Sequence, residues 1–195
     1  MNLPNKLTIA RLIMTPLFLA ALLISFPHNY LVALVIFALA SITDYIDGNL
    51  ARKYNLITDF GKFLDPLADK MLTTAAFLGF IKLDIGVGIT WITFIVLIRE
   101  FLITSLRLVS AGKGNVIAAN IWGKAKTVSQ MIAIIIAIGG RYIINLSEIY
   151  GFADVAAWNV IDIVTNVVLW ISAILTVISG VIYVVQNKGF IDHKK

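Results

Sequence analysis

Six runs of mainly apolar residues follow one another along the chain, and each is long enough to cross a bilayer as a helix. They cover about residues 7 to 26, 30 to 51, 65 to 82, 88 to 110, 121 to 142 and 158 to 186. A helix needs about 20 apolar residues to cross roughly 30 Å of hydrocarbon. Because 59% of the residues are apolar and only 14% are charged, with a mean hydropathy of +0.92, the sequence predicts an all-α, polytopic membrane protein with six transmembrane helices.

Little sequence lies outside these runs, so we expect a single membrane domain over residues 1–195. The first run follows Lys6 and Arg11, as the apolar part of a secretory signal would, but no small-residue cleavage site comes after it. We therefore expect this run to remain as a membrane helix. The longest connection would be residues 141–158, RYIINLSEIYGFADVAAW, whose apolar spacing suits a segment that lies along the membrane interface.

Basic residues gather on one side of the six predicted spans. The other side would hold Lys82 and Arg141, while Arg99 would lie within a span. The remaining cations are Lys6, Arg11, Arg52, Lys53, Lys62, Lys70, Arg107, Lys113, Lys124, Lys126, Lys188, Lys194 and Lys195. Because cytoplasmic loops carry an excess of Lys and Arg, both termini are expected in the cytoplasm.

The net charge and the aromatic residues also fit a membrane protein. A net charge of +5, dispersed along the chain, does not indicate a nucleic-acid partner, and the absence of cysteine excludes disulfides and thiolate metal sites. Several aromatic residues near the predicted span ends are expected to be interfacial anchors. They are Tyr30, Trp91, Tyr142, Trp158, Tyr183 and Phe190.

Five aspartates lie in one segment, residues 44–69, DYIDGNLARKYNLITDFGKFLDPLAD. In a helix that begins at Tyr30, Asp44 is about 21 Å along the axis and therefore still inside the roughly 30 Å of hydrocarbon. Asp44 and Asp47 fall on one helix face, with the small residues Gly48 and Ala51 beside them. The sequence thus predicts two carboxylates within a span, on a face that leaves room for a ligand.

The following span returns in the opposite direction and brings two more carboxylates. Asp65, followed by Pro66, is expected to be the N-cap of this span, and Asp69 lies one turn further on. Antiparallel neighbours with axes ~8 to 10 Å apart would direct both acidic pairs into one space. Gly61 would again leave room for a bulky ligand, and Arg52 is placed to pair with a phosphate.

Four carboxylates in one intramembrane space need positive charge between them. Each buried acid costs roughly 2.5 to 3.5 kcal/mol even on the lenient insertion scale. Hard divalent cations prefer carboxylate oxygens, and a two-metal site suits phosphoryl transfer. The alternative is that the acids are helix caps and surface ion pairs, which would account for Asp59 and Asp65 but not for Asp44 and Asp47 within a span.

The segment also resembles a known family. It meets the pattern DxxDGxxARx8Gx3Dx3D, the signature of the CDP-alcohol phosphatidyltransferases, at every fixed position. The matching residues are Asp44, Asp47, Gly48, Ala51, Arg52, Gly61, Asp65 and Asp69. The resemblance implies a six-span enzyme, generally a homodimer, in a bacterial cell membrane with its active site facing the cytoplasm. Such an enzyme joins a CDP-linked lipid to an alcohol and releases CMP.

The resemblance also implies roles for the motif residues. Two Mg²⁺ or Mn²⁺ ions per active site would be bound by the four aspartates, and Asp69 would in addition act as the base. The residues that would border the CDP-lipid are Asp44, Asp47, Gly48, Ala51, Arg52 and Gly61. The segments NLPNKLTIAR, IREFLITSLRLVSAGKG and GKAKTVSQ resemble the branch that uses CDP-diacylglycerol and glycerol 3-phosphate. Inositol phosphate, serine and phosphatidylglycerol stay open as alternative acceptors, and a metal-binding transporter is a remote alternative.

Polar residues in the fourth and fifth spans favour an anionic acceptor. Glu100, Thr104 and Arg107 form one stripe on an apolar helix. The residues expected to bind an acceptor phosphate are Thr8, Arg11, Lys62, Arg107, Lys124 and Lys126. The alternative for these cations is membrane anchoring by snorkelling. Arg99 and Glu100 lie mid-span, where an internal polar network is expected, and the sequence leaves its role open.

Overall fold

The chain forms six long helices over the residues that its computed structural model describes, which are 3–53, 59–112, 121–151 and 155–187. Within these ranges only the backbone is described at 3–4, 45–53, 59–63, 65, 66, 69, 111 and 112. The helices are α1 (Leu3–Leu23), α2 (Asn29–Lys53), α3 (Asp59–Lys82), α4 (Ile89–Gly112), α5 (Ile121–Tyr150) and α6 (Val155–Gln186). The prediction of an all-α fold is confirmed.

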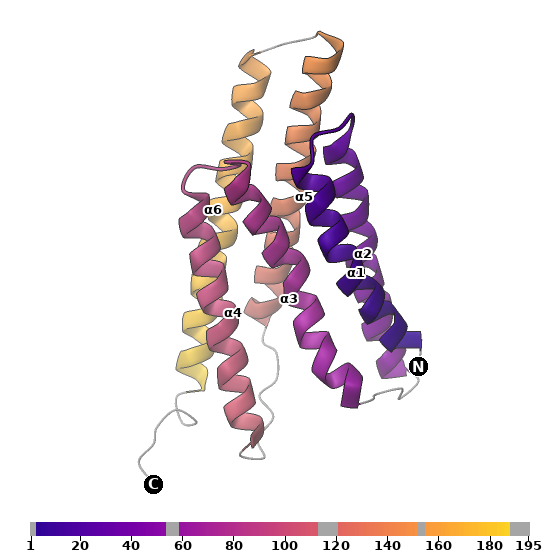
Figure 1. Cartoon of the computed structure of the whole chain (residues 1–195). Helices are drawn as coiled ribbons and strands as arrows, with labels where there is room; N and C mark the ends of the chain where they lie inside the picture. Colours follow the sequence, from indigo (N-terminus) through magenta and orange to yellow (C-terminus); the bar gives the residue numbers. More distant parts are fainter. Residues whose placement is uncertain (1–2, 54–58, 113–120, 152–154, 188–195) are drawn as a thin grey trace.

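Successive helices run in opposite directions along one bundle (Figure 1). α1 packs along both α2 and α3, while α6 packs along α4 and α5. α5 also contacts α2 and α3, so it connects the two halves of the bundle. One end of the bundle holds the starts of α1, α3 and α5 and the ends of α2, α4 and α6 (Figure 1). We call it the motif end.

The expected direct pairing of the second and third helices is only partly realised. Among the described residues α2 has a small contact with α3, because α1 packs against both of them. Phe18 of α1 packs against Phe37 of α2, with ring centroids 5.6 Å apart and ring planes at 50°. One turn further along α1, Gly79 of α3 makes room for Leu22, whose Cδ2 lies 2.5 Å from where a Cβ would stand.

Three helices are long and apolar enough to cross a membrane by length and composition, among the residues with a described placement. Their candidate spans are Asn5–Leu23, Ile121–Tyr150 and Val155–Gln186, and a shorter apolar segment covers Asn29–Asp44. Many large apolar side chains on the helices are exposed, for example Leu108 and Trp91, at 68% and 67%. Such an exterior suits contact with lipid.

Helices α5 and α6 extend beyond the rest of the bundle at the end opposite the motif end (Figure 1). In the turn between α3 and α4, the Val87 amide donates to Asn166 Oδ1 (2.5 Å), at a point roughly 16 Å from the start of α6. Trp170 Nε1 donates to the Val87 carbonyl (3.1 Å). The turn that joins α3 to α4 is therefore fixed to the side of α6, well below the tip of the α5–α6 hairpin.

The prediction of a long interfacial connection over residues 141–158 was wrong. α5 continues to Tyr150 and α6 begins at Val155. Pairing between the two helices accounts for the extra turns, because Trp158 Nε1 donates to Ser147 Oγ (2.8 Å) and Arg141 lies 4.0 Å from Asp162. The apolar spacing that indicated an interfacial segment is thus the spacing of two continuing helices.

The prediction that Asp65 caps its helix was also wrong. α3 begins at Asp59, and Asp65 and Pro66 lie inside it. Phe60, Leu64 and Leu67 recur at helical spacing, so the apolar period extends further back than the Asp-Pro pair indicates. The consequence is that more than one turn of α3 precedes Asp65.

Candidate active site

The signature residues lie on the last turns of α2 and the first turns of α3. Both segments belong to the motif end of the bundle (Figure 1). Asp44 is the one signature aspartate whose side chain is described. The signature residues whose side chains lie outside the described part are Asp47, Gly48, Ala51, Arg52, Gly61, Asp65 and Asp69.

Asp44 forms an ion pair with Arg11 of α1. Arg11 Nη1 lies 2.6 Å from Asp44 Oδ1, and the two side chains are 2% and 39% exposed. Thr15 donates its hydroxyl proton to the Arg11 carbonyl (2.9 Å), and Thr8, one turn before Arg11, is buried. Two residues that the sequence assigned to different ligands, a metal and an acceptor phosphate, are therefore in direct contact. No spacing rule indicates this pair, because it joins separate helices.

The carboxylates provide suitable chemistry for a hard divalent cation. Asp44 contributes a carboxylate whose Oδ1 faces Arg11. Backbone placement puts Asp47 on the same helix and Asp65 and Asp69 on α3, at the same end of the bundle. Oxygen donors of this type suit Mg²⁺ or Mn²⁺. Within the described residues, no group of three or more His, Cys, Asp or Glu side chains could hold a metal.

A second polar cluster joins four helices. Glu100 Oε1 on α4 accepts from Lys126 Nζ on α5 and from Arg99 Nη1 (3.2 Å). Arg99 Nη2 donates to Ser179 Oγ on α6 (2.9 Å), and Lys70 Nζ on α3 donates to Thr104 Oγ1. Because the Arg99 and Glu100 side chains are only 12% and 14% exposed, the predicted internal polar network is confirmed.

Arg107 lies one helical turn nearer the motif end than Thr104 and contacts Tyr183 of α6. Its Nε donates to Tyr183 Oη (3.1 Å), and its Cζ lies 5.5 Å from the centre of the ring. The prediction that Tyr183 is an interfacial anchor was wrong, because the residue is 2% exposed and packs under the guanidinium. Its proximity to a span end was misleading.

The lysines predicted to bind the acceptor phosphate differ in burial, and the side chain of one of them is not described. Lys124 is exposed in the first turn of α5, whereas Lys126, two residues later, is 4% exposed. The Lys62 side chain lies outside the described residues. The structure thus buries Lys126 against Glu100, whereas Lys124 and Arg107 are both exposed, Arg107 in contact with Tyr183.

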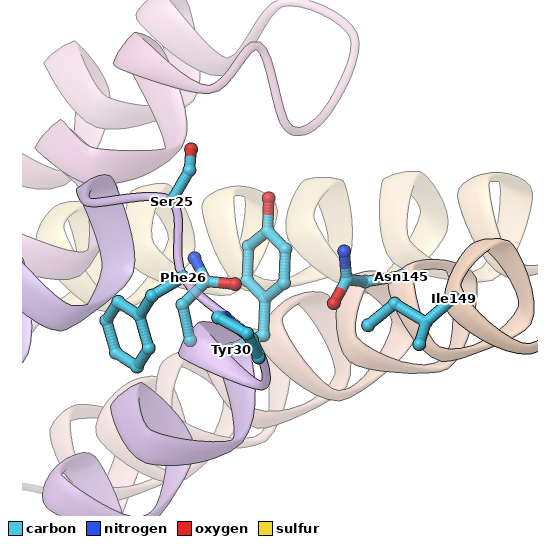
Figure 2. Close-up of a pocket in the computed structure, with 7 residues that line it drawn as sticks. Ser25, Phe26, Tyr30, Asn145 and Ile149 are labelled. Carbon is cyan, nitrogen blue, oxygen red and sulfur yellow. The ribbon is translucent and has the colours of Figure 1, made fainter.

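A pocket of about 380 Å³ lies at the opposite end of the bundle (Figure 2). It is lined by the turn between α1 and α2, by the first two residues of α2, and by Asn145 and Ile149 of α5. None of its lining residues belongs to the signature. The candidate active site therefore lies at the motif end.

Residues 1–178 match the family model for CDP-alcohol phosphatidyltransferase. The chain belongs to this family. Family membership decides between an enzyme and a transporter in favour of the enzyme.

Several named relatives match nearly the whole of this chain. The chain is 39% identical to CDP-diacylglycerol–glycerol-3-phosphate 3-phosphatidyltransferase of Bacillus subtilis, with 95% of each chain covered. It is 43% identical to a probable phosphatidylglycerophosphate synthase of Mycobacterium tuberculosis, covering 95% of this chain and 81% of that one. The enzyme of Haemophilus influenzae with the same name as the Bacillus relative is 36% identical, with 96% and 94% covered.

Proposed function

We propose that this CDP-alcohol phosphatidyltransferase transfers the phosphatidyl group of CDP-diacylglycerol to glycerol 3-phosphate, giving phosphatidylglycerol phosphate and CMP in phospholipid biosynthesis. The observation that carries the proposal is similarity over nearly the whole chain to relatives named for this reaction. The signature residues on α2 and α3 supply the chemistry that such a transfer needs.

The proposed setting is the cell membrane of a bacterium, with six spans and both termini in the cytoplasm. The positive-inside distribution supports this orientation. The arrangement of the six helices supports it too, because α1 begins and α6 ends at the motif end (Figure 1). The donor's acyl chains would stay in the bilayer while its diphosphate meets the carboxylates. A homodimer is part of the proposal, as the family resemblance implies.

The signature residues would act as follows. Asp69 takes the proton from the primary hydroxyl of glycerol 3-phosphate. The alkoxide attacks the lipid-side phosphorus, the bond to the CMP oxygen breaks, and Arg52 pairs with the leaving phosphate. Gly48, Ala51 and Gly61 allow the nucleotide diphosphate to approach the helix backbone.

Asp44, Asp47, Asp65 and Asp69 would bind two Mg²⁺ or Mn²⁺ ions. When bound, the ions neutralise charge on the phosphates. The Arg11–Asp44 ion pair gives Arg11 a defined place beside this set. Its guanidinium balances the Asp44 charge on the α1 side, which leaves the α3 side for the donor.

The acceptor phosphate would be bound by cations at the motif end. Lys126 is buried against Glu100, and the exposed Arg107 is held by Tyr183. Lys124 at the start of α5, Lys62, Thr8 and Arg11 complete the proposed set. A cationic site of this kind favours a phosphorylated alcohol over serine, which lacks a phosphate.

A panel of acceptors tests the proposal. The purified protein, in detergent with CDP-diacylglycerol and Mg²⁺ or Mn²⁺, is given glycerol 3-phosphate, inositol phosphate, serine or phosphatidylglycerol, and CMP release is measured. The expected result is release with glycerol 3-phosphate well above the other acceptors, and loss of release after addition of a chelator. Faster release with any other acceptor would overturn the assigned substrate.

A further inference from the structure

The Lys126 side chain is buried, and its ammonium keeps hydrogen-bond donors that have no acceptor among the described residues. The residue is 4% exposed, and its Nζ donates to Glu100 Oε1. A lysine ammonium has three N–H donors. Among the described residues Glu100 supplies the acceptor for one of them. A desolvated ammonium with unused donors is suited to an incoming anion.

Glu100 is itself fixed from the opposite side. Arg99 Nη1 donates to Glu100 Oε1 (3.2 Å), and Arg99 Nη2 donates to Ser179 Oγ on α6 (2.9 Å). Gly180 lets the arginine stem lie close to α6, since a Cβ there would be 3.2 Å from Arg99 Cγ. One carboxylate thus faces two cations, Arg99 and Lys126, and these three groups keep one net positive charge.

The same network reaches the helix that carries Asp69. Lys70, the next residue in the chain, donates to Thr104 Oγ1. Thr104 in turn donates to the Glu100 carbonyl (2.7 Å). Lys70 and the Lys126 ammonium therefore belong to one connected set of contacts across α3, α4 and α5. This set joins the cationic cluster to the residue of α3 that follows Asp69 in the chain.

We propose that Glu100 is a positioning residue, which fixes the Lys126 ammonium so that its remaining donors bind the phosphate of a small phosphorylated alcohol. The inference rests on the proposed function and assigns Glu100 a role in acceptor selection. A free lysine side chain has many rotamers, and holding it in the bound arrangement lowers the entropy lost when the acceptor binds. The Glu100 carboxylate thus favours acceptor binding without touching the acceptor.

The Glu100→Gln variant separates this role from a purely structural one. The expected Michaelis constant for glycerol 3-phosphate rises about tenfold, which corresponds to the loss of one well-placed charged contact. The constant for CDP-diacylglycerol and kcat should stay within about twofold. Asp162→Asn is the matched control, because Asp162 faces Arg141 near the far end of the bundle. A lower acceptor constant, or equal losses for both substrates, would overturn the proposal.

A double-variant cycle covers the case in which Glu100→Gln folds poorly. Lys126→Met alone should raise the acceptor constant, and adding Glu100→Gln to it should change that constant little, because Glu100 would act through Lys126. The double variant also leaves neither group of the pair charged. Independent, multiplying effects would show that Glu100 does not act through Lys126.

The unmodified protein distinguishes a failure of this inference from a failure of the proposed function. If it turns over inositol phosphate but not glycerol 3-phosphate, the assigned acceptor is wrong, and Glu100 is judged by the same criterion on inositol phosphate. If it prefers an acceptor without phosphate, both proposals are overturned. If it uses glycerol 3-phosphate and the variants leave its Michaelis constant unchanged, only the positioning role is overturned.

Discussion

At the scale of single residues, ion pairing between helices organises the motif end. Arg11 and Asp44 join α1 to α2, and Glu100 joins α4 to α5 through Lys126. Such pairs are costly to bury without a partner, because a lone intramembrane charge is strongly disfavoured. Each charged side chain in these pairs therefore constrains the position of a neighbouring helix as well as the chemistry.

Asp69→Asn tests the proposed base. The amide cannot accept the hydroxyl proton, so CMP release should fall by about 10²- to 10⁴-fold, the usual contribution of a general base. The rate of CMP release from CDP-diacylglycerol, measured with purified protein and saturating glycerol 3-phosphate, checks this. Asp162→Asn should keep the parent rate. An unchanged rate in Asp69→Asn would mean that another group removes the proton.

Arg107 and Tyr183 form a pair whose effects should be graded. Arg107→Ala should raise the Michaelis constant for glycerol 3-phosphate about tenfold or more, since a charge-assisted contact contributes roughly 1.5 to 3 kcal/mol. Tyr183→Phe removes only the hydroxyl that accepts from Arg107 Nε and keeps the ring below the guanidinium. It should therefore cause a smaller increase. Initial-rate measurements at varied acceptor and fixed donor distinguish the two, and an effect of Arg107→Ala on the donor constant alone would contradict the assignment.

At the scale of helices, close packing depends on small residues at particular positions. Gly139 and Gly140 are neighbours on α5 with different surroundings. A Cβ at Gly140 would lie 2.6 Å from Ile161 Cγ2 of α6, whereas a Cβ at Gly139 would have no neighbouring atom of the described residues within 4 Å. Only one of the two glycines is thus required for the approach of α5 and α6.

These adjacent glycines give a matched pair of variants. Gly140→Ala should destabilise the protein by about 1 to 3 kcal/mol, because the β-branched Ile161 has little rotamer freedom with which to yield. Gly139→Ala should be neutral or stabilising by up to about 1 kcal/mol, through helix propensity. Thermal unfolding in detergent measures both. Equal changes in the unfolding temperature of the two variants would show that the predicted clash at Gly140 is relieved at no cost in stability.

The sequence predicted the existence of the helices better than their ends. The length of the apolar runs identified all six helices described here, and the mid-span charges of Arg99 and Glu100 correctly indicated an internal network. The prediction from sequence failed where a local signal had a second physical cause. Asp65-Pro66 is favourable at a helix start, yet α3 continues before it, and the polar residues of 141–158 pair between two helices. The partners Arg11–Asp44 and Arg107–Tyr183 could not be predicted, because they depend on which helices pack together.

At the scale of the whole molecule, the proposed orientation has a direct test because the natural chain contains no cysteine. A single cysteine at Tyr150, which is 58% exposed at the end of α5, should react in intact cells with a membrane-impermeant maleimide. A cysteine at Lys124, in the first turn of α5, should react only after the cells are opened. The reverse pattern would place the motif end outside the cell and contradict the proposed cytoplasmic site.

The length of α5 and α6 has a practical consequence. At ~1.5 Å per residue these helices measure roughly 45 and 48 Å, longer than a hydrocarbon layer of about 30 Å. Among the described residues, no side chain lies within 4 Å of the Cβ position at Gly151, which follows α5. An antibody epitope introduced at this tip would stand clear of the catalytic half of the molecule, and it would add recognisable mass to a small protein for single-particle imaging.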